Sequence, residues 1–259
     1  MIDSRSVQAA ILDLDGVVTE TARLHARAWR DMFDAVLDER GEREGEDQSP
    51  FGVDDYDQYV DGKPRYDGVR SFLEARGIDL PEGAPDDPPD AVTIHGLGNR
   101  KNERFHELLE QHGVEVYDDA IEQIRRWRTR GLGVAVVSSS KNCKTILERA
   151  GLLDLFDARV DGVVAERLGL DGKPAPDIFL EAADRLGVEP ERAAVFEDAR
   201  AGVEAGRAGG FGLVVGVSRN GNDEALRAHG ADVVVHDLRE VEDRIQEHRA
   251  SDGQSSARG

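Results

Sequence analysis

Two aspartates stand two residues apart at the end of the first apolar run of the chain. Asp13 and Asp15 lie in the stretch Ile11–Thr19, which has no helical spacing and meets a glycine at Gly16. We therefore expect a buried strand that opens into a loop. Alternate residues of a strand point to one side, so one bound group could contact both carboxylates. The alternative is a pair of solvated loop acids, because burying carboxylates is costly unless a cation or a reaction uses them.

Polar residues also follow the later apolar runs. Ser138, Ser139 and Ser140 precede Lys141 and Asn142, where a helix is expected to begin. Hydroxyls and backbone N–H groups at a helix N-terminus suit a phosphate, although a serine there can equally be an ordinary helix cap. Both interpretations are open from the residues alone.

A lysine and two more acids complete the set. Lys173 is one of only five lysines in the chain, which otherwise uses arginine, so a compact point charge is retained at this position. Glu197 and Asp198 stand where another buried run meets a helix. They can be a capping pair or hard oxygen ligands for Mg²⁺.

Together these residues can perform phosphoryl transfer. A lysine and a metal ion would neutralise enough charge for a carboxylate to approach a phosphoryl group. Asp13 could then attack phosphorus and form an aspartyl-phosphate, and Asp15 could act as general acid and base. Ser138 and Lys173 could hold phosphate oxygens. The candidate ligands of Mg²⁺ are Asp13, Asp15, Glu197 and Asp198.

Composition bounds the class of protein. The chain has 259 residues, with 53 Asp and Glu against 33 Lys and Arg, a net charge of −20. This predicts an acidic, salt-adapted surface that would repel nucleic acid and anionic membranes. We find no signal sequence and no apolar stretch long enough to span a bilayer, so we expect a cytoplasmic enzyme. A monomer is expected. The single cysteine, Cys143, is interpreted as a small buried side chain.

The order of apolar runs predicts the architecture. After residue 115, short β-branched runs alternate with helical stretches, the pattern of a Rossmann-like, doubly wound parallel α/β sheet. The segment between the first strand and the next is different, because it has helical stripes and two polar loops. We expect an inserted α-helical cap over the carboxyl ends of the strands, where such sheets bind ligands. The expected strands are 11–15, 133–137, 193–196, 212–217 and 232–235, and the expected core helices are 141–150, 176–186, 199–208 and 222–228. In the cap we expect helices at 21–37, 69–75 and 100–112, and loops at 38–50 and 80–90.

The chain resembles the haloacid dehalogenase superfamily, and within it the β-phosphoglucomutase-like group, from Ala9 to about Val235. The four superfamily motifs occur in order, as Asp13-x-Asp15, Ser138, Lys173 and Glu197-Asp198. The resemblance implies a catalytic core at residues 1–20 and 110–249, a cap at 21–109 and a flexible tail at 250–259. It also implies a Mg²⁺-dependent enzyme whose substrate is a small sugar phosphate.

Finer details are similar to the mutase group. The stretch Val60–Arg65 resembles the cap segment whose arginine holds the phosphate that is not transferred, so Arg65 takes that role by resemblance, and Lys63 could share it. Lys101 resembles the cap lysine that reaches the active site. Thr21 and His25 are expected near Asp15. The expected reaction interconverts β-glucose 1-phosphate and glucose 6-phosphate. The alternatives are a sugar-phosphate phosphatase with the same motifs and, from another class, a non-catalytic sugar-phosphate sensor.

Overall fold

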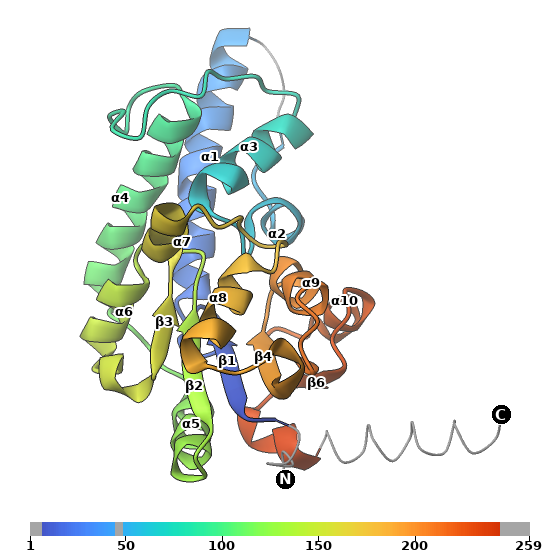
Figure 1. Cartoon of the computed structure of the whole chain (residues 1–259). Coiled ribbons are helices and arrows are strands. Elements are labelled where there is room, and N and C mark those ends of the chain that lie inside the picture. Colours follow the sequence, from blue (N-terminus) through green and yellow to red (C-terminus); the bar gives the residue numbers. More distant parts are fainter. Residues whose placement is uncertain (1–6, 45–48, 244–259) are drawn as a thin grey trace, which may run out of the picture. The chain divides into compact units, whose positions relative to one another are not determined.

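Two compact units make up the structure, a computed structural model that describes residues 7–44 and 49–243 (Figure 1). The core unit comprises Met1–Glu20 and Glu115–Gly259, and the cap unit is Thr21–Val114. The predicted boundary between residues 109 and 110 falls inside helix α4, Ile94–His112, which is capped by Gly113 with a φ of +73°. The expected flexible tail, residues 250–259, lies outside the described residues.

The core unit is built on one parallel sheet of six strands in the order β3-β2-β1-β4-β5-β6. This confirms the predicted Rossmann-like, doubly wound sheet. The central strand is Ala9–Asp13, so it ends two residues before the predicted end at Asp15. The strands are β1 Ala9–Asp13, β2 Gly133–Val137, β3 Ala158–Val160, β4 Ala193–Glu197, β5 Leu213–Val217 and β6 Val233–Val235.

Alternate side chains of these strands enter two apolar layers. Ile11 lies in a cluster with Phe179 of helix α8 and Val203 of helix α9. On the next strand, Phe196 meets the ring of Trp127 of helix α5, with 4.8 Å between centroids. Because both faces are covered, the strands read as continuous apolar runs rather than alternating ones.

Helices connect the strands of the core unit. The four predicted core helices are present, each starting one or two residues later than predicted. Two helices and one strand, α5, α7 and β3, are additional to the prediction. The helices are α5 Asp118–Thr129, α6 Cys143–Ala150, α7 Gly162–Leu168, α8 Asp177–Leu186, α9 Arg200–Ala208 and α10 Asp223–Ala228, with short 3₁₀ turns at Leu153–Leu155, Pro190–Arg192 and Leu238–Glu240.

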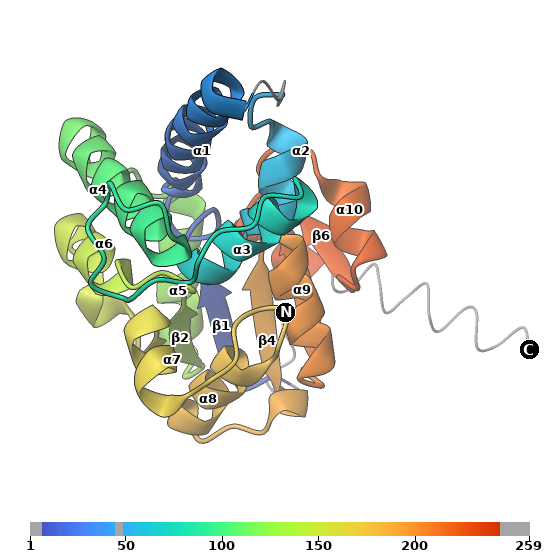
Figure 2. The ribbon, with the colours of Figure 1, turned by 90° about the horizontal axis from the view of Figure 1, so that it is seen from above.

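The cap unit is helical. Its two long helices, α1 and α4, run side by side, and α3 packs on both (Figure 2). The rings of Trp29, Phe33 and Phe51 stack in the centre of its own apolar core, and the ring of Phe72 lies tilted against that of Phe33. The elements are α1 Ala22–Glu44, α2 Val53–Asp55, the π-helix Tyr56–Val60, α3 Arg65–Ala75 and α4 Ile94–His112.

Two cap loops were predicted. The first prediction, at residues 38–50, was wrong at its start, because α1 continues to Glu44 with charged residues that favour helix. The second, at residues 80–90, contains no helix or strand.

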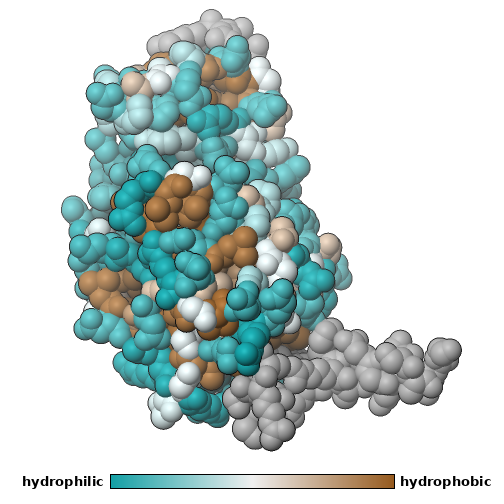
Figure 3. Space-filling model, viewed as in Figure 1, coloured by the Kyte–Doolittle hydropathy of each residue, from teal (hydrophilic) through white to brown (hydrophobic). Residues whose placement is uncertain are grey.

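Charged and polar side chains dominate the face seen in Figure 3, and an apolar patch lies over α7. There Val163 is 51% and Leu168 46% exposed, so the patch is small. None of the helices in the described residues is long and apolar enough to cross a membrane.

Candidate active site

The parallel register brings the polar strand ends to one edge of the sheet. Asp13 pairs with Val137 at the end of β2, and Leu12 pairs with Phe196 in β4. Asp13, Ser138 and Glu197 therefore all stand at the carboxyl edge. The sequence motifs thus meet within the core unit, although they are spread over nearly two hundred residues.

Lys173 ties two of these acids together. Its Nζ donates to Asp13 Oδ1 at 2.5 Å and also to Glu197 Oε1. The side chains of Lys173 and Glu197 are fully buried, and that of Asp13 nearly so. A buried charge needs an opposite charge, and here one cation faces two carboxylates.

Burial and charge shift the pKa values of this cluster. Burial raises the pKa of Asp13 well above its ordinary value; Lys173 opposes the rise, and Glu197 and Asp15 add to it. Burial alone would lower the pKa of Lys173, but the charges of Asp13 and Glu197 raise it above its usual value. Lys173 therefore stays protonated and serves as a fixed positive charge beside Asp13.

Asp15 lies beyond the strand, in a turn, yet it reaches the same cluster. Its backbone N–H donates to Asp13 Oδ2 at 2.8 Å, and Ser138 Oγ donates to Asp15 Oδ2 at 3.1 Å. The expected same-side arrangement through strand alternation is thus replaced by a turn, which Gly16 permits with a φ of +93°. Ser138, predicted to hold phosphate, contacts the proposed acid/base residue.

The predicted phosphate loop is a turn before α6, which begins only at Cys143. Ser140 Oγ accepts from the backbone N–H of Asn142 at 3.1 Å, and Ser138 Oγ accepts from that of Ser140 at 3.1 Å. Ser139 lies in the same turn. The ammonium group of Lys141 sits 2.6 Å from Glu166 Oε1 of α7, in an exposed ion pair. The predicted phosphate ligand Lys141 therefore pairs with a carboxylate of α7.

Close backbone approaches support the metal-ligand candidates. A Cβ added to Gly16 would come within 1.8 Å of Asp198 Oδ2, so this carboxylate lies against the loop that follows Asp13. Glu197 has both oxygens engaged, one by Lys173 and the other by the Ala199 N–H at 2.8 Å.

The carboxylates at this edge of the sheet fit a Mg²⁺ site that has few protein ligands. Within residues 7–44 and 49–243, no group of three or more His, Cys, Asp or Glu side chains could hold a metal ion. Mg²⁺ usually binds through one or two carboxylates plus waters and substrate phosphate, rather than in a complete protein cage. Asp13 and Asp198 could supply those carboxylates, while both oxygens of Glu197 already accept hydrogen bonds.

The cap candidates form their own group. His25 Nδ1 and Lys101 Nζ are 2.6 Å apart, and the imidazole stacks on Phe105 with 4.0 Å between centroids. Burial, followed by the charges of Lys101 and Arg65, lowers the pKa of His25 well below its ordinary value. The imidazole is therefore neutral and accepts a hydrogen bond from Lys101.

The remaining cap candidates lie on or beside the same helices. Arg65 begins α3 and donates to Asn102 Oδ1 of α4 at 2.8 Å. Lys63 Nζ donates to Ser71 Oγ at 2.9 Å, so it is directed to α3 itself. Thr21 is buried and its carbonyl accepts from the N–H of His25.

Sequence reasoning missed a partly buried ion pair next to the loop that follows β1. Arg219 donates to both oxygens of Asp119, at 3.2 and 2.9 Å, and to the carbonyl of Val17 at 3.4 Å. Its guanidinium lies 4.1 Å from the ring centroid of Tyr117. The available signal was Asp118-Asp119 followed by apolar residues at helical spacing, which marks the start of α5.

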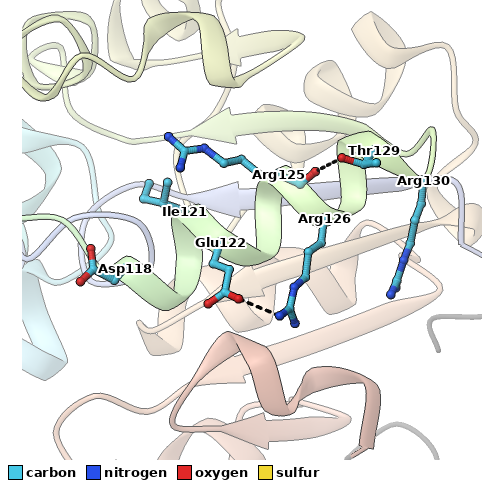
Figure 4. Close-up of a pocket in the computed structure, with 7 residues that line it drawn as sticks. All are labelled: Asp118, Ile121, Glu122, Arg125, Arg126, Thr129 and Arg130. Atoms are coloured by element: carbon cyan, nitrogen blue, oxygen red, sulfur yellow. Dashed lines mark hydrogen bonds and ion pairs between the residues drawn. The ribbon is translucent and has the colours of Figure 1, made fainter.

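The structure also has a surface pocket of about 430 Å³ along α5 (Figure 4). Figure 4 shows the side chains of Arg125, Arg126 and Arg130 spread along the helix, with Arg126 paired to Glu122. None of the predicted site residues lines this pocket. The candidate active site is therefore the carboxyl edge of the sheet and not this hollow.

Comparison with known proteins covers nearly the whole chain. The model of the haloacid dehalogenase-like hydrolase family matches residues 7–210. A beta-phosphoglucomutase of Mycobacterium tuberculosis is 54% identical over 239 residues, which are 91% of this chain and 91% of that protein. A beta-phosphoglucomutase of Bacillus subtilis is 30% identical over 230 residues, with 88% of this chain and 89% of that protein covered.

A solved structure is similar throughout as well. The 2.27 Å crystal structure of a beta-phosphoglucomutase from Clostridium difficile has a TM-score of 0.72 and 25% sequence identity to this chain. The match covers 95% of this chain and 98% of the other. Core and cap elements are therefore both represented in these relatives.

Proposed function

Because the chain belongs to the haloacid dehalogenase-like hydrolase family, we propose that it is a β-phosphoglucomutase. It would interconvert β-glucose 1-phosphate and glucose 6-phosphate through a bisphosphate intermediate and an aspartyl-phosphate. The observation that carries the chemistry is the buried contact of Lys173 with Asp13 and Glu197. The choice of a sugar phosphate rests on the likeness to the named relatives.

Asp13 is the proposed nucleophile. One carboxylate oxygen forms a bond to phosphorus while the bond from phosphorus to the sugar oxygen breaks. Lys173 offsets the negative charge that accumulates when a carboxylate meets a phosphate. The N–H of Asp15, 2.8 Å from Asp13 Oδ2, orients the carboxylate.

Asp15 is the proposed general acid and base. It gives a proton to the sugar oxygen that departs and takes one from the hydroxyl that attacks the aspartyl-phosphate. Ser138, 3.1 Å from Asp15 Oδ2, fixes its orientation. Phosphoryl transfer to one sugar oxygen and removal from the other leaves Asp13 phosphorylated, as it was at the start.

Mg²⁺ is the proposed cofactor, held by Asp13 and Asp198, with Asp15 and Glu197 beside them. When bound, the ion supplies positive charge to the transferring phosphoryl oxygens. Arg65 is proposed to bind the phosphate that is not transferred, with Lys63, Lys101, His25 and Thr21 as further cap residues at the substrate. Ser139, Ser140, Lys141 and Asn142 remain candidates for phosphate contacts. We propose a monomeric enzyme that works in the cytoplasm on small sugar phosphates.

One assay tests this proposal. Purified protein with Mg²⁺ receives β-glucose 1-phosphate and a trace of glucose 1,6-bisphosphate, and both glucose 6-phosphate and free phosphate are measured. Glucose 6-phosphate without free phosphate is expected. Free phosphate alone would replace the mutase by a phosphatase, and neither product, with sugar phosphate still bound, would indicate a sensor. Chelation of Mg²⁺ should abolish turnover and its return should restore it.

A further inference from the structure

The guanidinium of Arg65 is held by amide oxygens of helix α4. Its Nη2 donates to Asn102 Oδ1 at 2.8 Å and its Nη1 to Asn99 Oδ1 at 3.5 Å. It also lies 5.6 Å from the ring centroid of Tyr66. An amide oxygen accepts a hydrogen bond but carries no net charge. These contacts therefore orient the guanidinium through hydrogen bonds to uncharged acceptors.

The α3–α4 loop, residues 76–93, determines which way Asn99 faces. Asn99 Nδ2 donates to two loop carbonyls, Pro85 O at 3.1 Å and Asp87 O at 2.8 Å. Because only the NH₂ group can donate, these two acceptors direct Oδ1 to the opposite side. There it accepts from Tyr66 Oη at 2.9 Å as well as from Arg65.

The loop itself is anchored to the start of α4. The carboxylate of Asp87 accepts from Thr93 Oγ1 at 2.6 Å and from the N–H of Ala84 at 3.1 Å. Arg100 Nε donates to Pro89 O at 2.9 Å. The carbonyls that orient Asn99 therefore belong to a fixed segment, which runs from the end of α3 to α4 in Figure 1.

A glycine permits the close contact of the two helices at this point. A Cβ on Gly98 would come within 2.6 Å of the Tyr66 ring and 3.3 Å of Arg65 Cδ. Tyr66 and Arg65 can therefore lie directly against α4, within reach of Asn99.

We propose that Asn99 and the α3–α4 loop form a positioning relay for Arg65 that sets the affinity for a doubly charged phosphate on the substrate. The relay runs from the loop carbonyls through the Asn99 amide to Tyr66 and Arg65. It rests on the proposed function, because Arg65 takes the phosphate that is not transferred. Asn99 and Tyr66 are positioning residues.

The test compares two substrates of Asn99→Ala. With β-glucose 1-phosphate, KM should rise about tenfold or more, the scale of a lost hydrogen bond to a charged group, while kcat changes by less than about threefold. With p-nitrophenyl phosphate, which has only the phosphate being transferred, kcat/KM should stay within about twofold of wild type. A general loss of structure would instead lower kcat/KM for both substrates.

Two further variants complete the experiment. Glu103→Ala, an exposed position on the same helix, should leave both substrates unaffected. Tyr66→Phe keeps the ring and removes only the hydroxyl, so it should fold even where Asn99→Ala does not, and should raise the KM for β-glucose 1-phosphate about threefold. An unchanged KM in Tyr66→Phe and in folded Asn99→Ala, or equal losses on both substrates, would overturn the relay.

Failure of the proposed function gives a different result. If wild type releases phosphate from β-glucose 1-phosphate and forms no glucose 6-phosphate, the mutase assignment fails. In that case β-glucose 1-phosphate, like p-nitrophenyl phosphate, carries only the phosphate that is transferred, so its KM should not change in Asn99→Ala. The relay is then tested with glucose 1,6-bisphosphate, which carries a second phosphate and whose KM should rise about tenfold in Asn99→Ala. A relay failure leaves wild-type mutase activity intact.

Discussion

The core and the cap each bury a lysine, and they surround it differently. Lys173 in the core is 3% exposed and contacts two carboxylates. Lys101 in the cap is 4% exposed, and its contacts within the cap include a neutral imidazole and the faces of Trp29 and Phe105, at 4.8 and 5.3 Å. The core places two negative charges against its cation, whereas these cap contacts come from uncharged groups.

The two cations therefore have different roles in the core and in the cap. A cation between two acids holds a nucleophile in place and limits repulsion of phosphate. Amides, an imidazole and aromatic rings hold a cation through uncharged groups, so these contacts add no negative charge that would repel phosphate. Arg65, on amide oxygens, follows the same principle as Lys101.

The largest expected effect is loss of the nucleophile. Asp13→Asn keeps the size of the side chain but cannot form the aspartyl-phosphate, so mutase activity should fall at least about 10⁴-fold. Circular dichroism should be unchanged. Activity above about one hundredth of wild type would contradict the role assigned to the core cluster.

Removal of the core lysine should cost stability as well as activity. Lys173→Met leaves Asp13 and Glu197 buried without their cation, and loss of one partner of a buried pair typically destabilises by about 3–5 kcal/mol. Urea unfolding measures this. Lys144→Met is the matched control, because its side chain is 59% exposed and its ion pair with Glu148 should contribute less than about 1 kcal/mol. Similar losses for the two variants would remove the distinction between a buried, neutralised lysine and a surface one.

The buried His25 of the cap should make the unfolding free energy depend on pH. The folded-state pKa of His25 lies below its unfolded value, so the unfolded chain binds the proton first as pH falls. Stability is fully present above the unfolded pKa and declines below it, by about 1 kcal/mol between pH 7.5 and 5.5.

Unfolding free energies at these two pH values test this. His25→Gln should reduce the decline by that amount, and His112→Gln, an exposed histidine on α4, should not. A decline of the same size in His25→Gln as in wild type would show that His25 is protonated equally in both states.

Salt should have the smallest effect on the core cluster. Raising KCl from 0.1 to 1 M relaxes repulsion across a surface of net charge −20, so wild type should gain stability. The difference between wild type and Lys173→Met should change by less than about 0.5 kcal/mol, because buried charges are little screened. A melting temperature independent of salt would mean that the acidic surface has another purpose.

The residues that carry the proposed chemistry could be identified from the sequence, whereas contacts between residues far apart in the chain could not. The two strands that carry Asp13 and Glu197 could be predicted from their apolar runs, but their ends differ from the prediction by two residues in β1 and one in β4. Lys173 was predicted at this site as a phosphate ligand, but its contact with both acids was not, because it depends on how a loop folds. The partner of Lys141 could not be predicted, because Glu166 lies on a helix with no clear stripe.

The cap shows the same limit. Its long helices followed from apolar spacing, and Arg65 from resemblance. Asn99 gave no signal, because its role depends on two carbonyls of a loop that has no regular structure. Neither a sequence motif nor the spacing of apolar residues identifies a polar residue whose partners are backbone carbonyls.

The chain leaves the core unit for the cap and returns at adjacent points. The N–H of Glu20 donates to the carbonyl of Glu115 at 2.9 Å, and Thr19 bridges to Val116 beside it. Because hydrogen bonds already join the two ends of this insertion, the whole insertion can be replaced as one unit. Cutting there and closing the gap with a short turn would remove none of the six strands of the core unit, so a different insertion could be joined at the same two points.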